Sequence, residues 1–199
     1  MLDVKDQHET VIGKVTPITV RTLDEPSVIE ALTRWRNARR KHFFTQFEAT
    51  PERTRRWLET VVLTDPTRLI LIVHSLRQPI GHLGFKIRPE RLVELDNMLR
   101  GEKPDHLELM FRANATMVQW LFANFDLQGA YMYTLNTNTR ALELHYGIGF
   151  KLKESSPVKK IEEDGEARYV TLPHDKESPD GLYFYKLELR RCDFILHQG

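Results

Sequence analysis

The segment ELDNMLRGEKPDHLELMF, Glu94–Phe111, changes its pattern of apolar residues halfway along. Its first part alternates apolar and polar side chains as a strand does, and its last part repeats apolar side chains at helical spacing. The charged loop Arg100–Asp105 lies between them. The apolar stripe continues to Phe125, Gly129 ends the helix, and AYMYTL begins a second strand. A helix that joins two short strands predicts a βαβ unit with parallel strands and a right-handed crossover.

The chain before this unit predicts one strand, two helices and an antiparallel series. Residues 1–16 are expected to form a loose arm or an edge strand. The following elements are a strand ITVRTL at 18–23, helices beginning near Pro26-Ser27 and at Thr50-Pro51-Glu52, and strands RLILIV at 68–73, QPIGHLGFKI at 78–87 and RLVELDNML at 91–99. The run at 68–73 is apolar throughout, which is typical of a strand buried on both faces.

The chain after the βαβ unit predicts a short helix within 138–150, a hairpin and a last strand. Asp164-Gly165 separates two alternating runs, which is a hairpin signal. The last strand is LYFYKLELR at 182–190, and the charged, proline-containing loop 173–181 is expected to be exposed and mobile. Since there is no internal repeat or linker, residues 1–199 are interpreted as one mixed α/β domain.

Composition limits the classes of function. The chain has 199 residues, 41% of them apolar, and a net charge of +1, which supports one globular domain and gives no general attraction to nucleic acid. A lone Cys192 excludes an internal disulfide, and no apolar run is long enough to span a bilayer. The eight histidines lack metal-binding spacing, so no metal is expected. A cytoplasmic monomer or homodimer without a secretory signal is the expectation.

The loop Arg100–Asp105 is a candidate anion site because it leads from a strand into the first turn of a helix. Arg100 and Lys103 add positive charge, Gly101 permits close approach of the backbone, and Asp105 is a candidate cap of the helix. The alternative is that the loop is a solvated connection, since neither the Walker nor the dinucleotide-binding fingerprint is present.

The later segment NTNTRALELHYGIGF, 136–150, supports the anion-site interpretation. Its matching residues are Asn138, Ala141, Leu144, Gly149 and Phe150. They fit the Asn-x-x-Ala-x-x-Leu-Tyr-x-x-x-Gly-Phe pattern, and from about residue 18 to residue 154 the chain resembles the Gcn5-related N-acetyltransferase (GNAT) family. The resemblance implies an α+β fold with a mostly antiparallel sheet of about seven strands, a central parallel splay and flanking helices.

The resemblance also implies acetyl-CoA as the cofactor. The loop departs from the family's Gln/Arg-x-x-Gly-x-Gly/Ala motif and keeps its glycine and its charge. The pyrophosphate is expected on this loop, and the pantetheine arm is expected to pair with backbone near Asn97. The cofactor-binding candidates are Asn97, Met98, Leu99, Arg100, Gly101, Lys103, Asp105 and Asn138.

Four residues are candidates for the chemistry. Position 145 is a histidine where the family commonly has a tyrosine that protonates the departing thiolate, and Tyr146 follows it. His145 can serve as the acid or only pack, with Tyr146 turned to solvent. Glu94 and Asp96 share one face of their strand, and either is a candidate base or simply part of a solvated face.

The acceptor site implied by the resemblance includes Trp35, Arg36 and Asn37, with His82 as a further candidate. The alternatives are that the basic face of this helix is simply solvated and that His82 is structural. The match resembles enzymes that acetylate amino sugars on nucleotide carriers, whose diphosphate would contact Arg36, Arg39 and Arg40. It also resembles, more broadly, enzymes that acetylate the N-termini of ribosomal proteins. The three hypotheses are therefore an amino-sugar acetyltransferase, a protein N-terminal acetyltransferase, and a non-catalytic acyl-CoA-binding module.

Overall fold

The computed structural model describes residues 1–76 and 78–194. Its strands are β1 (Leu2–Lys5), β2 (Val11–Pro17), β3 (Thr45–Gln46), β4 (Arg68–Ser75), β5 (Pro79–Arg88), β6 (Leu92–Arg100), β7 (Gly129–Leu135), β8 (Lys151–Glu163), β9 (Glu166–Thr171) and β10 (Tyr183–Arg190). Its helices are α1 (Pro26–Ala38), α2 (Pro51–Trp57), α3 (Leu109–Asn124) and α4 (Thr139–Ile148), and a π-helical turn, Leu58–Val62, extends α2.

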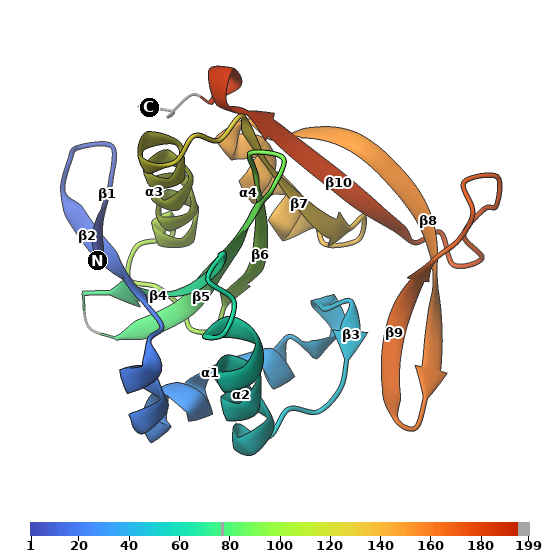
Figure 1. The fold of residues 1–199 in the computed structure, drawn as a ribbon, viewed down its shortest axis with the longest axis horizontal. Coiled ribbons are helices and arrows are strands. Elements are labelled where there is room, and N and C mark those ends of the chain that lie inside the picture. Colours follow the sequence, from blue (N-terminus) through green and yellow to red (C-terminus); the bar gives the residue numbers. More distant parts are fainter. Residues whose placement is uncertain (77, 195–199) are drawn as a thin grey trace.

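The strands form one sheet in the order β1-β2-β4-β5-β6-β7-β10-β8-β9-β3 (Figure 1). Among the described strand pairs, β6 and β7 run parallel and the others antiparallel. The predicted α+β fold with a parallel splay is confirmed, although the sheet has ten strands where about seven were expected. No helix in the described part of the chain is long and apolar enough to cross a membrane.

Strand β4 shows why the sheet is covered on both faces. Leu71 and Val73 pack in the core that contains α3, whereas Ile70 and Ile72 pack in a second core with α1. Alternate residues of a strand point to opposite faces, so a run that is apolar at every position requires two cores. The helices α1 and α2 therefore lie on one face and α3 on the other.

The first strand was predicted wrongly. Residues 18–23 are not a strand: β2 ends at Pro17, and a 3₁₀ turn follows at Val20–Asp24. The backbone N–H of Thr19 donates to the Thr22 hydroxyl at 3.0 Å. A side chain that bonds its local backbone competes with strand pairing, and alternation alone does not reveal this competition. Of the two alternatives for residues 1–16, the edge strand agrees with the structure, because β1 lies at the edge of the sheet and forms a hairpin with β2.

The start of α2 and the late hairpin agree with the sequence. Thr50 caps α2 by accepting a hydrogen bond from the backbone of Arg53 at 3.2 Å. Asp164 and Gly165 have φ values of 51° and 78°, as a tight turn between β8 and β9 requires. The first part of β8 pairs with β10 and its second part with β9, so the β8–β9 hairpin leaves the main sheet as an arm (Figure 1).

Strands β6 and β7 separate partway along their length. Their pairing covers Leu92–Leu95 and the facing residues of β7, and no pair joins them beyond it in the described structure. On its other edge, β6 places Asn97 and Met98 opposite the single residue Leu83, because His82 pairs with Leu99 and Gly84 with Asp96. Asn97 has φ 49°. A β-bulge of this kind bends the strand away from its partner and opens a wedge.

Candidate active site

The wedge between β6 and β7 is a cavity of about 160 Å³. Its walls come from β5, β6, β7, α3, α4 and the segment after α1, and they include Asp96, Asn97, Met98, Thr134 and Asn138. The predicted cofactor residues Asn97, Met98, Leu99 and Asn138 are thus brought together. Since β6 does not pair with β7 here, the backbone groups on that edge are available to an extended ligand.

His145 of α4 is one of the residues that line this wedge. Its side chain is 1% exposed, its Nδ1 lies 2.7 Å from the carbonyl oxygen of Ala141, and its Nε2 lies 3.2 Å from Nδ2 of Asn114. Nδ1 must donate to the carbonyl, so Nε2 accepts from the amide. Burial lowers the pKa of His145 to about 4. A neutral ring with both nitrogens paired holds α4 against α3 and has no free proton for a leaving group near pH 7.

Tyr146 does not join His145 in the wedge. Its side chain is 44% exposed, and it is not among the residues that line the wedge. Adjacent positions of a helix are separated by about 100° and face different directions. The structure therefore places the two predicted proton donors in different environments.

A wider groove of about 790 Å³ adjoins the wedge through Met98, Leu99 and Asn138. Four cationic residues line it: Arg39, Lys41, Arg100 and Arg140. Within residues 1–76 and 78–194, none of these four forms an ion pair with a carboxylate. Unneutralised cations beside a narrow, apolar-lined wedge fit a ligand with a slender tail and a phosphate-bearing end.

The loop after β6 differs from the prediction. The backbone N–H groups of Gly101 and Glu102 both donate to the carbonyl oxygen of Ile80, at 2.8 and 2.9 Å, so they are not free for a phosphate. The Asp105 cap is wrong, because α3 begins at Leu109 and has Glu108 at its N-cap. Of the loop residues 100–105, Arg100 lines the groove. The loop therefore contributes charge at one position and does not form the predicted backbone cradle.

Trp35 explains why this loop is fixed. Its indole Nε1 donates to Oε1 of Glu102 at 2.8 Å, and Arg34 binds the same oxygen at 2.8 Å. A Cβ added to Gly101 would overlap the indole ring, which only glycine avoids here. Trp35 was predicted to bind the acceptor, but its 2% exposed side chain holds the loop instead.

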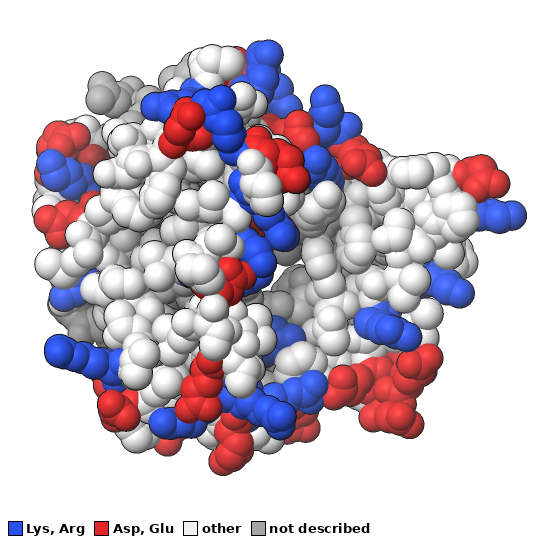
Figure 2. Space-filling model, in the orientation of Figure 1, with Lys and Arg blue, Asp and Glu red and all other residues white. Residues whose placement is uncertain are grey.

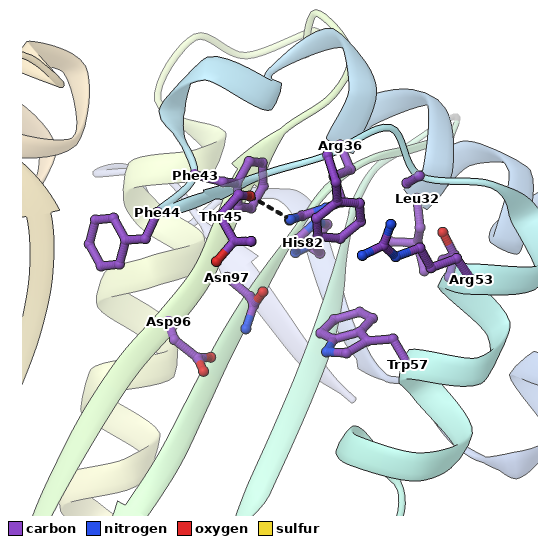
Figure 3. A pocket seen from close by; sticks show the side chains of 13 residues that line it. Leu32, Arg36, Phe43, Phe44, Thr45, Arg53, Trp57, His82, Asp96 and Asn97 are labelled. Atoms are coloured by element: carbon purple, nitrogen blue, oxygen red, sulfur yellow. Dashed lines mark hydrogen bonds between the residues drawn. The ribbon is translucent and has the colours of Figure 1, made fainter. Parts of the chain in front are cut away.

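A third cavity, of about 510 Å³, lies between β5–β6 and the segment that joins α1 to α2 (Figure 3). Its aromatic lining consists of Phe43, Phe44, Phe47 and Trp57. We call it the acceptor pocket. Asp96 and Asn97 line both this pocket and the wedge, so the two cavities meet at these residues.

Two of the predicted acceptor residues, Arg36 and His82, line this pocket (Figure 3). His82 is 5% exposed, burial lowers its pKa to about 4, and its Nδ1 has no hydrogen-bond partner in the described structure. Asn37 does not line the pocket. Its side-chain amide donates to the carbonyl of Ala49 and accepts from the same residue's N–H, at 2.9 and 2.8 Å, which fixes the loop before α2.

The two predicted carboxylates occupy different positions. Asp96 forms an ion pair with Arg68, and its Oδ1 makes no hydrogen bond with any described residue. Burial raises the pKa of Asp96 against the opposing charge of Arg68. Glu94 lies further down β6, paired with Arg88, and it accepts from the Tyr131 hydroxyl at 3.3 Å. Asp96 is the carboxylate at the junction of wedge and acceptor pocket.

Sequence reasoning missed Arg53, which lines the pocket, and Arg68, which lies beside it. Arg53 lies over the ring of Phe47 with 3.5 Å between its Cζ and the ring centroid, and Arg68 pairs with Asp96. Arg53 and Arg68 lie in different elements, at positions that carry no motif. The aromatic residues of RWRNARRKHFF gave a partial signal, because Phe43 and Phe44, which follow the 3₁₀ turn Arg40–His42 after α1, line the pocket.

Residues 18–151 match the family model described as acetyltransferase (GNAT) domain. The chain therefore belongs to the GNAT acetyltransferase family, whose members transfer acetyl groups from acetyl-CoA. No protein of curated function matches the sequence significantly. The wedge and the cationic groove fit this cofactor, since they offer an unpaired strand edge for an extended arm and cations for phosphates.

Solved structures confirm the fold at low sequence identity. The spermidine N-acetyltransferase of Vibrio cholerae, solved with CoA and spermine, has a TM-score of 0.67 at 10% identity, over 91% of this chain and 96% of that one. The Salmonella typhimurium enzyme that modifies the N-terminal serine of ribosomal protein L7/L12 has a TM-score of 0.66 at 12% identity, over 91% of this chain and 96% of that one. The microcin C7 self-immunity acetyltransferase MccE, solved with acetyl-CoA and AMP, has a TM-score of 0.66 at 12% identity, over 89% of this chain and 92% of that one.

Proposed function

We propose that this chain acetylates the primary amine of an amino sugar carried on a nucleotide, with Asp96 as the base. The observation that carries the proposal is the position of Asp96, at the junction of the wedge and the acceptor pocket. A group in that position can reach an amine in the pocket while the amine faces the wedge.

The cofactor's place follows from the free edge of β6 and the cationic groove. The backbone of β6 from Asn97 to Leu99 would hold the pantetheine arm, and Arg39, Lys41, Arg100 and Arg140 would hold the phosphates. When bound, the cofactor supplies a thioester whose acetyl group is reactive toward amines. Asn138 lines both the wedge and the groove, so it would position the arm where the two meet.

Asp96 has the properties that proton removal requires. An amine attacks only in its neutral form, so a base must take a proton from the ammonium group. Burial raises the pKa of Asp96, which brings the carboxylate closer to the range where it accepts protons efficiently. Its Oδ1 has no hydrogen-bond partner in the described structure. His145, neutral and fully paired, positions the wall of the wedge in this scheme and donates no proton.

The character of the pocket favours a sugar over a polycation. Rings of Phe43, Phe47 and Trp57 line it and suit the apolar face of a sugar or a base. Among the described residues that line the pocket, Asp96 is the one carboxylate, and it is already paired with Arg68, whereas Arg36 and Arg53 add two positive charges. A polyamine would meet like charges there. A protein N-terminus carries fewer charges and is the second candidate, favoured by the position of the pocket beside the loop that joins α1 to α2.

Thiol release from acetyl-CoA, measured with a panel of amines, tests the proposal. Nucleotide-linked amino sugars should support release with a higher kcat/KM than peptides with free N-termini, spermidine or an aminoglycoside. Mass spectrometry should place one acetyl group on the sugar amine. Release with peptides and none with the sugars would reject the proposed acceptor, and no release with any amine would favour a binding module.

A further inference from the structure

We propose that Arg36 and Arg53 form a binding site for an oxyanion of the acceptor, a carboxylate or a phosphate, so that the acceptor is an amine that also carries a negative charge. This inference rests on the proposed function, because it assumes that the acceptor occupies the pocket which these arginines line. It adds a requirement on the substrate that neither the family nor the fold imposes.

The Arg36 guanidinium is held between two aromatic rings. Its Cζ lies 4.1 Å from the ring centroid of Phe43 and 4.3 Å from that of Phe47. Nη2 donates to the carbonyl oxygen of Thr45 at 3.0 Å, as the dashed line in Figure 3 marks. These contacts fix the plane and the direction of the guanidinium, so its geometry does not depend on a counter-charge.

Arg36 lacks the partner that a partly buried cation normally has. No carboxylate forms an ion pair with it among the described residues, and its buried Nε has no hydrogen-bond partner there. Burial, followed by the charge of Arg53, lowers the pKa of Arg36. A partly buried charge without a counter-charge is costly, and such sites are typical of ligand recognition.

Arg53 places a second positive charge on the same ring. Its Cζ lies 3.5 Å from the centroid of Phe47, and its Nη1 bonds to Oε1 of Glu166 on the arm at 2.8 Å. Two guanidinium groups at one aromatic ring repel each other, and the exposed pair with Glu166 offsets this only in part. An oxyanion near both would remove the repulsion and would accept hydrogen bonds from the fork of Arg36.

The arrangement orients the acceptor. The arginines come from α1 and α2, whereas Asp96 comes from β6 and is neutralised by Arg68. An acceptor with its oxyanion at the arginines would direct its amine toward Asp96 and the wedge. This polarity would select an anionic amine and reject polycations of similar size.

Matched pairs of amines test the inference. Glucosamine 6-phosphate against glucosamine tests phosphate, and an aromatic amino acid against its amide tests carboxylate. For the wild type, the anionic member should have the lower KM. Arg36→Gln should raise the KM of the anionic member about tenfold, the size expected for a lost charged hydrogen bond, and should leave the neutral member within about twofold. The KM of Arg36→Lys for the anionic member should lie between the values of the wild type and of Arg36→Gln. Arg56→Gln, an exposed residue of α2 outside the pocket, is the matched control.

A binding measurement separates this inference from the proposed function. Protein saturated with CoA, which fills the cofactor groove, is titrated with pyrophosphate and separately with acetate. Binding that weakens at least fivefold in Arg36→Gln supports the site even if no amine is acetylated, in which case the proposed function fails alone. Acetylation without preference for anionic amines, an equal KM increase for both members of a pair, or anion binding unchanged in Arg36→Gln would each overturn the inference.

Discussion

The wedge and the acceptor pocket each contain a buried histidine, and the two differ in how their nitrogens are used. The pKa of both side chains is lowered by burial to about 4. His145, at the wedge, has a partner for each ring nitrogen, whereas His82, in the acceptor pocket, leaves Nδ1 without one in the described structure.

The same contrast extends to the other polar groups of the acceptor pocket. The buried polar atoms without a hydrogen-bond partner in the described structure are Arg36 Nε, Arg68 Nε, His82 Nδ1 and Asp96 Oδ1. Three of these residues line the acceptor pocket, and Arg68 pairs with one of them. Buried polar groups are nearly always hydrogen-bonded in native proteins. The histidine of the wedge is therefore fully paired, whereas the unpaired side-chain atoms gather in and beside the acceptor pocket, where we propose that a polar ligand binds.

The largest effect is expected at the point where the two cavities meet. Asp96→Asn should lower kcat by about a hundredfold or more, because removal of a positioned base typically costs that much. Stopped or continuous thiol-release assays measure kcat, and CoA titration checks that the cofactor site is intact. Thermal unfolding must accompany them, since the change leaves Arg68 without its ion pair. A kcat within a few-fold of the wild type, with a folded variant, would contradict the role.

Glu94→Gln is the matched comparison for Asp96. Glu94 lies on the same strand and its charge contributes to the raised pKa of Asp96. The rate of the wild type should fall on acidification through a pKa above the ordinary 3.8 of an aspartate. Without the neighbouring negative charge, this acid limb should move to lower pH. If the acid limb of the pH–rate profile stayed at the same pH in Glu94→Gln, the pH dependence would not arise from Asp96.

The next effect is on stability, and it tests the two histidines directly. Their folded-state pKa values of about 4 lie below the ordinary 6.5. The folded state is therefore stabilised fully by the two neutral histidines above pH 6.5, and it loses this stabilisation as the pH falls toward 4. Each histidine should remove about 2 kcal/mol from the free energy of unfolding between pH 7 and pH 5.

Denaturant unfolding of variants measures this loss. His145→Gln should reduce the loss between pH 7 and pH 5 by about 2 kcal/mol, although the variant is less stable than the wild type at pH 7. His106→Gln, at an exposed position, is the control and should keep the wild-type dependence. A wild-type-like dependence in His145→Gln would show that burial does not hold this ring neutral.

A smaller effect is expected in the cationic groove, where the charges are more open to solvent. Arg140→Gln should raise the KM for acetyl-CoA by about three- to tenfold and leave kcat unchanged, because a phosphate contact contributes mainly to binding. The difference from the wild type should shrink as salt is added, since solvent screens exposed charges. An unchanged KM at low salt would place the phosphates elsewhere.

The contrast between the cavities also explains what the sequence could predict. Most of the order of elements and the βαβ unit follow from periodicity, which is a local signal. The separation of the two parallel strands was implied by the family resemblance that the residues of 136–150 carry. The strand predicted at 18–23 failed because a side-chain hydrogen bond between Thr19 and Thr22 forms a turn there. The Asp105 cap failed because α3 starts later, and the loop amides before it bond to β5.

The residues of the site were predictable to different degrees. Asn138 and Asp96 lie on elements that the motif or the alternation fixes, so their positions were predicted. Arg36 shares a helical turn with Trp35 and Asn37, and sequence alone could not show that it alone of the three points into the pocket. Arg53 and Arg68 reach the site through tertiary packing of α2 and β4, which no local pattern encodes.

The smallest predicted effect concerns the arm, which pairs through β9 with β3 at the acceptor pocket and also forms an ion pair with Arg53. Acidic side chains gather at the end of the β8–β9 hairpin (Figure 2), and from this group Glu166 binds Arg53 at 2.8 Å. Both side chains are 46% exposed, so Glu166→Gln should change the free energy of unfolding by no more than about 0.5 kcal/mol. The same change frees Arg53 to meet an anionic ligand, and it should lower the KM of an anionic amine by about two- to threefold at low salt. The neutral member of the pair should not respond. If Glu166→Gln instead raised the KM of both members, the arm would contribute to the shape of the pocket, and its charge would not balance that of Arg53.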